Sequence, residues 1–272
     1  MSEVDLYAHY GGWALVTGAA RGIGRAFAKE LAASGFKLLL VDKLAEENEA
    51  FSEQLAAEHG VETKAVTLDL LRQDLPTLAE RWSRDHDIGV LINNAGISPM
   101  GHFLEIPLET HLQTLELNCR ATLTLSHVIG NAMLRRGRGA ILIVSSESSL
   151  TGAPYFAHYA ASKGYGLNLS YGLYEELRHE GIDVLGVCPG LTRTAPIREL
   201  GLDETRPRVV PMHEPERVAS GALKALGKQP VVIPTPVDRL CATIMSKLLP
   251  RKWTLSLMAH SMKRMAPRLR RD

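Results

Sequence analysis

The stretch Thr17-Gly18-Ala19-Ala20-Arg21-Gly22-Ile23-Gly24 lies between an apolar run, Trp13-Ala14-Leu15-Val16, and a helix-forming segment that begins at Arg25. The apolar run is typical of a buried parallel strand. Glycines allow a tight turn and a close approach of the backbone to a ligand, and the start of a helix offers free N–H groups to a pyrophosphate. This order of strand, glycine turn and helix predicts a phosphate-binding device. The alternative is a glycine turn with a purely structural role.

Strand-like runs alternate with helical segments along the rest of the chain. The expected strands are 13–17, 36–42, 61–68, 88–92, 140–145, 182–187 and 231–233. The expected helices are about 23–34, 46–59, 73–85, 109–136, 156–180 and 214–227. This alternation predicts an α/β fold of the Rossmann type, a doubly wound parallel sheet that binds ligands at the C-terminal ends of its strands.

A length of 272 residues allows one large α/β domain. We expect residues 1–234 to form a Rossmann-type dinucleotide-binding and catalytic domain, and residues 235–272 to form an amphipathic, basic C-terminal extension of that domain. The three cysteines are scattered without metal or redox spacing, as in reduced cytosolic proteins. The N-terminus carries acidic residues and no apolar core of signal length, and no apolar run is long enough to span a bilayer. A cytoplasmic location is expected.

A second motif, Tyr159-Ala160-Ala161-Ser162-Lys163, places a phenol and an ammonium four residues apart in a segment that is expected to be helical. Residues at i and i+4 share one face of a helix. A free tyrosine is a poor base at neutral pH, and a nearby cation stabilises the phenolate and lowers its pKa. The pair can act as an acid/base device, although this spacing also occurs on helices by chance.

A serine pair ends the expected fifth strand, with Ser145 and Ser146 lying 14 and 13 residues before Tyr159. A hydroxyl at this position can stabilise charge that develops on a reacting oxygen. Ser146 fits this role, Ser145, Ser148 and Ser149 compete for it, and the alternative for each competitor is a capping or turn hydrogen bond.

Together these features resemble the short-chain dehydrogenase/reductase family. The resemblance covers roughly residues 12–233 and includes the glycine turn, the motif Asn93-Asn94-Ala95-Gly96 and the segment Pro189-Gly190-Leu191-Thr192-Arg193-Thr194. Each motif alone is modestly specific, whereas all of them in family order and spacing are highly specific. Ser149, where many members have a small Gly, and the long C-terminal tail are departures from the family pattern.

The resemblance implies a catalytic tetrad of Asn118, Ser146, Tyr159 and Lys163. Tyr159 would exchange the proton, Ser146 would orient the substrate oxygen, and Lys163 would lower the pKa of Tyr159 and hold the nicotinamide ribose. Asn118 would hold a water that links Lys163 to solvent; its alternative is an amide that kinks a helix and bonds to backbone. The residues expected at the cofactor are Thr17, Gly18, Arg21, Gly22, Ile23, Gly24, Asp42, Asp69, Asn94, Ala95, Gly96, Tyr159, Lys163, Pro189, Gly190, Thr192 and Thr194.

The choice of cofactor depends on the end of the second expected strand. Asp42, 18 residues after Gly24, can accept hydrogen bonds from both adenosine ribose hydroxyls and repels a 2′-phosphate, which favours NAD(H). Arg21 and Lys43 can pair with a 2′-phosphate, so NADP(H) remains open. Asp69 resembles the family residue beside the adenine ring and is also compatible with a helix N-cap.

The sequence indicates less about the substrate than about the cofactor. Thr194 is expected to hydrogen-bond the nicotinamide carboxamide, and about 195–213 is expected to form a lid with both apolar and charged residues. With Tyr155 and Phe156 nearby, this lid favours a sizeable apolar alcohol or ketone. His102, His111 and His127 lack metal-ligand spacing, so no metal is expected.

The C-terminal tail concentrates positive charge, because residues 247–272 carry +7 and the remaining chain carries −6. A first apolar stripe, broken by Pro250, is followed by a second stripe next to Trp253. The first comprises Val237, Leu240, Cys241, Ile244, Met245, Leu248 and Leu249, and the second comprises Leu255, Met258, Met262 and Met265. Such a tail can lie in a membrane interface, or its stripes can pack on the body or on another subunit.

These observations predict an NAD(P)-dependent oxidoreductase that interconverts a secondary alcohol and a ketone of steroid-like or long-chain character. The alternative is a non-catalytic NAD(H)-binding or membrane-docking module. The resemblance also implies a homodimer or homotetramer. No nucleic-acid partner is expected, and peripheral membrane contact through the tail is the remaining interaction to be considered.

Overall fold

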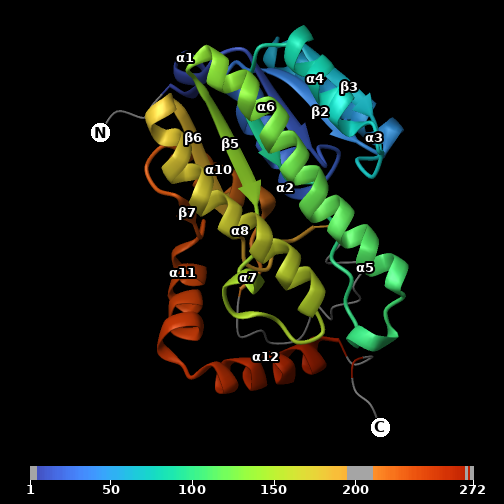
Figure 1. Ribbon diagram of the computed structural model, residues 1–272, viewed down its shortest axis with the longest axis vertical. Helices are drawn as coiled ribbons and strands as arrows, with labels where there is room; N and C mark the ends of the chain where they lie inside the picture. The colour runs from blue at the N-terminus through green and yellow to red at the C-terminus, as the bar shows by residue number, and fades with distance from the viewer. Residues whose placement is uncertain (1–4, 195–210, 267–268, 270–272) are drawn as a thin grey trace.

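The computed structural model describes residues 5–194, 211–266 and 269, and it shows a sheet with helices on both faces (Figure 1). The strands are β1 (Trp13–Thr17), β2 (Lys37–Asp42), β3 (Thr63–Thr67), β4 (Ile88–Asn93), β5 (Gly139–Val144), β6 (Ile182–Val187) and β7 (Val231–Val232). Their spatial order is β3-β2-β1-β4-β5-β6-β7, and every neighbouring pair is parallel. The predicted doubly wound sheet is confirmed.

The helices begin and end close to the predicted bounds. They are α1 (Leu6–Tyr10), α2 (Gly22–Ala33), α3 (Ala45–His59), α4 (Leu75–Asp85), α5 (Leu108–Leu115), α6 (Thr122–Arg136), α7 (Ser148–Thr151), α8 (Ala157–Leu177), α10 (Pro215–Ala225), α11 (Pro236–Thr243) and α12 (Arg251–Met265). Shorter turns are η1 (Phe103–Glu105), η2 (Glu116–Ala121), η3 (Arg178–Glu180) and η4 (Ile244–Leu248). None of the described helices is both long and apolar enough to cross a membrane.

Two apolar layers enclose the sheet, because successive strand residues point to opposite faces. Val16 packs in one layer with side chains of α2, α3 and α10, whereas Leu15 packs in the other with side chains of α4 and α6. Both strand residues are fully buried. Burial of a Leu or Val side chain stabilises the fold by about 1.5–3 kcal/mol. Coverage of both faces explains why inner strands such as β1 and β5 are buried along their whole length, whereas the edge strand β3 is not.

Two local features differ from the sequence-based expectation. Residues 109–136 were expected to form one helix, but the π-helical turn η2 separates α5 from α6. The short helix α1 was not predicted, because five residues carry too little periodicity. α1 is held by tertiary contacts: Tyr10 is buried and its hydroxyl donates a hydrogen bond to Asp183 Oδ2 over 2.7 Å.

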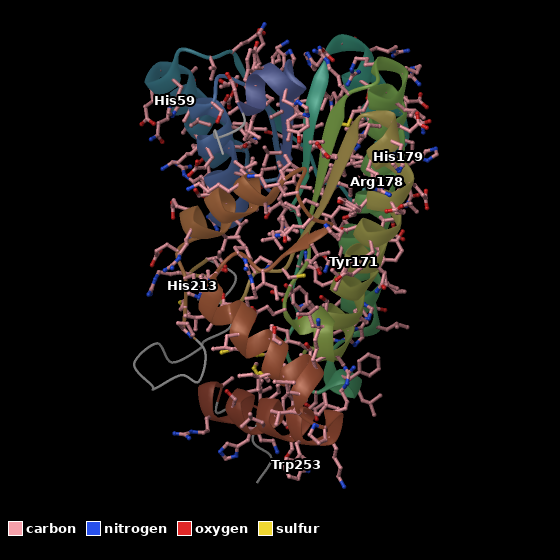
Figure 2. All side chains as sticks on the ribbon, turned by 90° about the vertical axis from the view of Figure 1, so that its left-hand side faces the viewer. His59, Tyr171, Arg178, His179, His213 and Trp253 are labelled. Carbon is pink, nitrogen blue, oxygen red and sulfur yellow. The ribbon has the colours of Figure 1, made fainter. Side chains whose placement is uncertain are left out.

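The tail forms two helices, as the break at Pro250 predicts. α11 lies below β7, past the end of the sheet, and α12 crosses the end of the molecule beneath α7 (Figure 1). Trp253 on α12 and His59 at the end of α3 lie at opposite ends of the molecule (Figure 2).

The glycine turn provides a stability test. A Cβ at Gly24 would lie 2.1 Å from the Gly18 carbonyl oxygen, and two backbone segments cannot relax cheaply. We therefore expect Gly24→Ala to lower the free energy of unfolding by about 2 kcal/mol or more. The measurement is urea unfolding followed by circular dichroism.

The matched control is Gly164→Ala, because Gly164 lies within α8 and a Cβ there meets no atom within 4 Å. Alanine favours a helix over glycine by up to about 1 kcal/mol, so this variant should be as stable as the wild type or more stable. Equal unfolding curves for wild type and Gly24→Ala would contradict the close-approach argument.

Candidate active site

A cleft of about 710 Å³ lies at the C-terminal edge of the sheet. The strand order reverses between β1 and β4 there, which is where doubly wound folds bind ligands. The predicted site residues that line it are Gly18, Arg21, Gly22, Ile23, Asp42, Asp69, Asn94, Ala95, Gly96, Ser146, Tyr159, Lys163, Pro189, Gly190, Thr192 and Thr194. Three predicted residues, Thr17, Gly24 and Asn118, lie behind this lining and are buried.

The Thr17 hydroxyl joins the glycine turn to the end of β4. Its Oγ1 donates to the Ile92 carbonyl over 3.1 Å and accepts from the N–H groups of Asn94 and Ala95 over 3.0 and 3.1 Å. Asn94 Nδ2 in turn donates to the Thr17 carbonyl over 2.9 Å. Thr17 therefore shapes the cleft from behind its wall.

The start of α2 can hold an anion. α2 begins at Gly22, and its N-cap residue Arg21 makes no side-chain capping bond, so the first N–H groups of the helix are not capped by that side chain. A Cβ at Gly22 would lie 2.9 Å from Thr194 Cγ2, and a Cβ at Gly18 would lie 2.8 Å from Asn94 Nδ2. Both glycines have a positive φ. A side chain at either glycine would collide with the protein itself, so only glycine fits at these two positions of the cleft wall. The bare backbone there can approach a ligand closely, which fits a dinucleotide pyrophosphate.

Asp42 is held firmly at the end of β2. Its Oδ2 accepts from the Ala20 N–H and its Oδ1 accepts from the Leu44 N–H, both over 3.0 Å. Arg21 forms an ion pair with Glu47, which lowers the pKa of that glutamate. The guanidinium of Arg21 is thus engaged at the same wall, whereas Lys43 is exposed at the rim of the cleft.

Asp69 lines the cleft beyond β3. Two roles were predicted for it, a position beside the adenine ring and a helix N-cap, and the structure differs from the second. Its Oδ1 accepts from the Leu71 N–H over 3.0 Å and closes a short turn. α4 begins at Leu75 and has Asp74 at its N-cap position. The N-cap interpretation of Asp69 is therefore wrong, because the helix starts later than the pattern indicated.

Lys163 lies at the floor of the cleft and is almost fully buried. Its Nζ donates to the Val144 carbonyl over 2.8 Å and lies 5.9 Å from the centre of the Tyr159 ring. A Cβ at Gly96 would lie 3.3 Å from Nζ, so glycine makes room for the ammonium. Burial lowers the pKa of Lys163 to about 8.

Tyr159 is half-buried, and burial raises the pKa of its hydroxyl although the hydrogen-bonding contribution of Ser146 lowers it. This differs from the expectation that Lys163 lowers the pKa of Tyr159. The physical reason is that desolvation disfavours the phenolate, while the ammonium is directed at the Val144 carbonyl. At neutral pH Tyr159 is consequently protonated and can serve as a proton donor.

Ser145, Ser146 and Ser148 make different hydrogen bonds in the structure. The Ser145 hydroxyl is buried and donates to the Lys163 carbonyl over 2.8 Å. Ser146 Oγ instead lines the cleft and accepts from the N–H and the hydroxyl of Ser148 over 3.2 and 3.0 Å. These two contacts fix the position of Ser146 Oγ at the wall of the cleft. Ser148, which was considered only as a competitor, therefore orients Ser146.

Asn118 lies in the π-helical turn η2 and is buried. Its Nδ2 donates to the Ile97 carbonyl and to Ser162 Oγ over 3.0 and 2.9 Å, and its Oδ1 accepts from the Ile97 N–H over 3.0 Å. The alternative of an amide bonded to backbone thus describes its side chain. The water-holding role stays a prediction, and the π-helical turn is of a kind often found at functional sites.

Residues beyond the expected motif hold the loop after β6. Asp238, which is buried in α11, lies so close to Gly190 that a Cβ there would be 2.7 Å from its Oδ2. His213 Nε2 lies 3.0 Å from Asp238 Oδ1, and His213 pairs with Thr192 in a short parallel bridge. Residues 195–210 of the expected lid lie outside the described residues. The Thr-x-x-Asp pattern at Thr235 was the signal that could have indicated a capped helix here.

Glu147 adds a buried carboxyl next to this loop. Its N–H donates to the Pro189 carbonyl over 3.0 Å, and burial together with the charge of Asp238 raises the pKa of Glu147 to about 8. The carboxyl is therefore mostly protonated at neutral pH.

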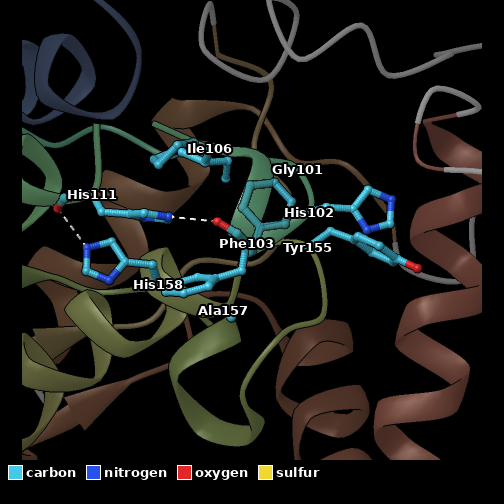
Figure 3. Close-up of a pocket in the computed structure, with 10 residues that line it drawn as sticks. Gly101, His102, Phe103, Ile106, His111, Tyr155, Ala157 and His158 are labelled. Carbon is cyan, nitrogen blue, oxygen red and sulfur yellow. Dashed lines mark hydrogen bonds between the residues drawn. The ribbon is translucent and has the colours of Figure 1, made fainter. Parts of the chain in front are cut away.

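A second, smaller pocket of about 160 Å³ lies between the start of α8 and the loop that follows β4 (Figure 3). His111 Nε2 donates to the Phe103 carbonyl over 3.1 Å, and His158 Nε2 donates to the His111 carbonyl over 2.9 Å. Tyr155, with φ +65°, packs edge-on against His102. The ring of His158 is thus held by a backbone carbonyl of α5.

Comparison with known proteins shows related sequences and folds. A family profile described as "short chain dehydrogenase" matches residues 12–205. The "Very-long-chain 3-oxoacyl-CoA reductase" of Bos taurus is 30% identical over 244 residues, which are 88% of this chain and 76% of that protein. The "Inactive hydroxysteroid dehydrogenase-like protein 1" of Rattus norvegicus is 33% identical over 192 residues, 69% of this chain and 58% of that protein.

Solved structures agree on the fold. A short-chain dehydrogenase from Sphingobium yanoikuyae in complex with NADPH has a TM-score of 0.76 and 30% identity, covering 87% of this chain and 96% of that one. A 7beta-hydroxysteroid dehydrogenase has a TM-score of 0.86 and 23% identity, covering 94% of this chain and 99% of that one. At that identity the second likeness concerns the fold alone.

The pKa of Lys163 leads to a pH prediction. Because that pKa is about 8, the ammonium is charged below this pH and neutral above it. If the charge helps to bind a nicotinamide dinucleotide, the Kd of the cofactor should rise as the pH increases through about 8. Fluorescence titration across this range is the measurement.

Lys163→Met is the matched variant, since it keeps an unbranched side chain without a titrating group. Its cofactor affinity should be weaker than that of the wild type and should not change across the same pH range. A wild-type profile that stays flat through this range would contradict a role for the Lys163 charge.

Proposed function

The chain belongs to the short-chain dehydrogenase family, and we propose that it catalyses the NAD(P)-dependent interconversion of a large apolar ketone and its secondary alcohol. The observation that carries this proposal is the convergence of Ser146, Tyr159 and Lys163 on the cleft that also contains the glycine turn. A proton donor, a hydroxyl donor and a buried cation are the groups that a carbonyl needs during reduction.

The residues of the cleft fit a nicotinamide dinucleotide. Gly18, Gly22 and the start of α2 would hold the pyrophosphate, Asp42 would hold the adenosine ribose, and Lys163 would hold the nicotinamide ribose. When bound, such a cofactor supplies or accepts the hydride. The protein supplies position and proton chemistry.

The protonated Tyr159 favours reduction of a ketone, because a phenol can donate its proton to the carbonyl oxygen. Ser146 would donate a second hydrogen bond to that oxygen, with Ser148 holding it in orientation.

The substrate class is argued from the walls of the cleft and from the relatives. Ile97 and Leu117 add apolar surface beside Tyr159. Related proteins are named as reductases of very-long-chain 3-oxoacyl-CoA and as hydroxysteroid dehydrogenase-like proteins. Both names refer to large apolar compounds, and we extend that class to this chain as a proposal.

A direct assay can test the substrate class. Purified protein is incubated with long-chain 3-oxoacyl thioesters, oxosteroids and, as polar controls, oxidised sugars, and the oxidation of NADH or NADPH is followed by absorbance. We expect turnover only with the large apolar ketones. Turnover restricted to the sugars would overturn this choice of substrate.

A non-catalytic NAD(H)-binding protein is the second candidate function, because one relative is named as inactive. Against it, Tyr159, Lys163 and Ser146 are all present and lie together at the cleft. Cofactor binding without turnover of any ketone in the panel would favour this second function.

Replacing Tyr159 by Phe tests the proton donor. The ring stays and the exchangeable proton is lost, so turnover should fall by roughly 10²-fold or more while the Kd of the cofactor changes little. Steady-state kinetics and cofactor titration give the two quantities. Comparable turnover in Tyr159→Phe would overturn the assignment of the catalytic residues.

Asp42 tests the proposed preference for NAD(H). We expect wild type to bind NADH more tightly than NADPH, because a fixed carboxylate repels a 2′-phosphate, and Asp42→Ala to shift the ratio toward NADPH by about tenfold or more. Both cofactors are titrated against both proteins. Tighter binding of NADPH by the wild type would mean that Arg21 and Lys43 outweigh Asp42.

A further inference from the structure

The inner faces of the two tail helices pack on the body. On α12, the Thr151 hydroxyl lies 3.5 Å from Met258 Sδ, and Arg251 donates to the Thr151 carbonyl over 2.6 Å. Met262 contacts a small apolar cluster that includes Tyr155. Met258 and Met262 of the second apolar stripe are therefore turned toward the body and keep only part of their surface exposed.

The outer faces carry a different set of apolar side chains. Val237, Leu240, Ile244 and Leu248 share one side of α11 and η4 and are 50%, 63%, 37% and 71% exposed. Trp253 and Leu257 on α12 are 68% and 43% exposed, and Trp253 is on the side of α12 turned away from the molecule (Figure 2). We call these six residues the tail patch. The first stripe thus has two parts. Its tail-patch members are exposed, whereas Cys241, Met245 and Leu249 are only half-exposed.

The tail segment that carries this patch has charged side chains of one sign. Residues 239–266 contain no Asp or Glu, and the exposed cations are Arg239, Lys247, Arg251, Lys252, Lys263 and Arg264. The remainder of the chain before residue 247 carries a net charge of −6. Apolar side chains with a tryptophan, surrounded by Lys and Arg, are typical of helices that lie in the interface of an anionic bilayer.

We propose that the tail patch docks on a membrane surface that contains anionic lipid. Anionic headgroups complement the cations, while Leu248 and Trp253 reach the boundary between headgroups and acyl chains. A second copy of the chain is a poorer occupant, because a symmetric contact would bring two cationic rims together. This docking does not require the proposed catalytic activity.

Vesicle binding of the full-length protein tests the proposal. Vesicles of phosphatidylcholine alone are compared with vesicles that contain about one third phosphatidylglycerol, and the bound fraction is measured by sedimentation. We expect binding to the anionic vesicles, weakening as salt shortens the screening length. Removal of a single cation, as in Lys252→Gln, should weaken binding by about fivefold. A full-length protein that ignores anionic vesicles overturns the proposal.

The double variant Leu248→Glu, Trp253→Glu should lose most vesicle binding, by about tenfold or more, while its melting temperature stays close to that of the wild type. Leu134→Glu is the matched control, since Leu134 is 41% exposed on α6, away from the tail. It should bind vesicles like the wild type. If the double variant instead retains vesicle binding and changes the oligomeric mass in light scattering, a second copy covers the patch and the proposal fails.

Tryptophan fluorescence gives an independent readout of contact. The chain has three tryptophans, and Trp13 and Trp82 are buried at 7% and 5% exposure, so lipid-borne quenchers report mainly on Trp253. Brominated anionic lipid should quench the wild-type emission. Trp253→Phe should abolish the quenching and retain vesicle binding. Binding without quenching of Trp253 would place the contact elsewhere and overturn the assignment to the tail patch.

Discussion

The hydroxyl of Thr17 makes the hydrogen bonds on which the arrangement of the cleft depends. It bonds to the carbonyl of Ile92 and to the N–H groups of Asn94 and Ala95, and so joins the end of β1 to the end of β4. This junction is the place where the strand order changes direction. With the two strand ends held together, the glycine turn can approach the backbone after β4, and the start of α2 faces the cleft.

Burial then decides the proton chemistry of the site. Lys163 is held beneath Gly96 and bonded to a backbone carbonyl, and its pKa falls to about 8 because water is excluded. The same exclusion raises the pKa of Tyr159 and keeps its proton in place. A phenol that holds its proton at neutral pH is suited to donate that proton to the oxygen of a carbonyl that is being reduced.

The inner faces of the C-terminal helices support the rest of the molecule. Asp238 of α11 packs against Gly190 and holds His213, so the helix supports the loop that lines the cleft after β6. The inner face of α12 covers the end of the molecule near Tyr155. Because the inner faces take part in this packing, the tail patch is the apolar part of the described tail helices that stays exposed.

The sequence by itself determined the seven strands, the glycine turn and the spacing of Tyr159 and Lys163. These features come from local periodicity, from the backbone freedom of glycine and from the pitch of a helix, all of which act over a few residues. They were sufficient to predict the sheet, whereas most of the residues predicted at the cleft came from the resemblance to the short-chain dehydrogenase family. The tertiary structure alone decided the interactions between residues far apart in the chain. It placed Asp238 against Gly190, directed Lys163 to Val144 and selected Ser146 through Ser148. It also turned one set of tail side chains inward and the other outward, because the face that a helix buries depends on the surface it meets, and no local pattern contains that surface.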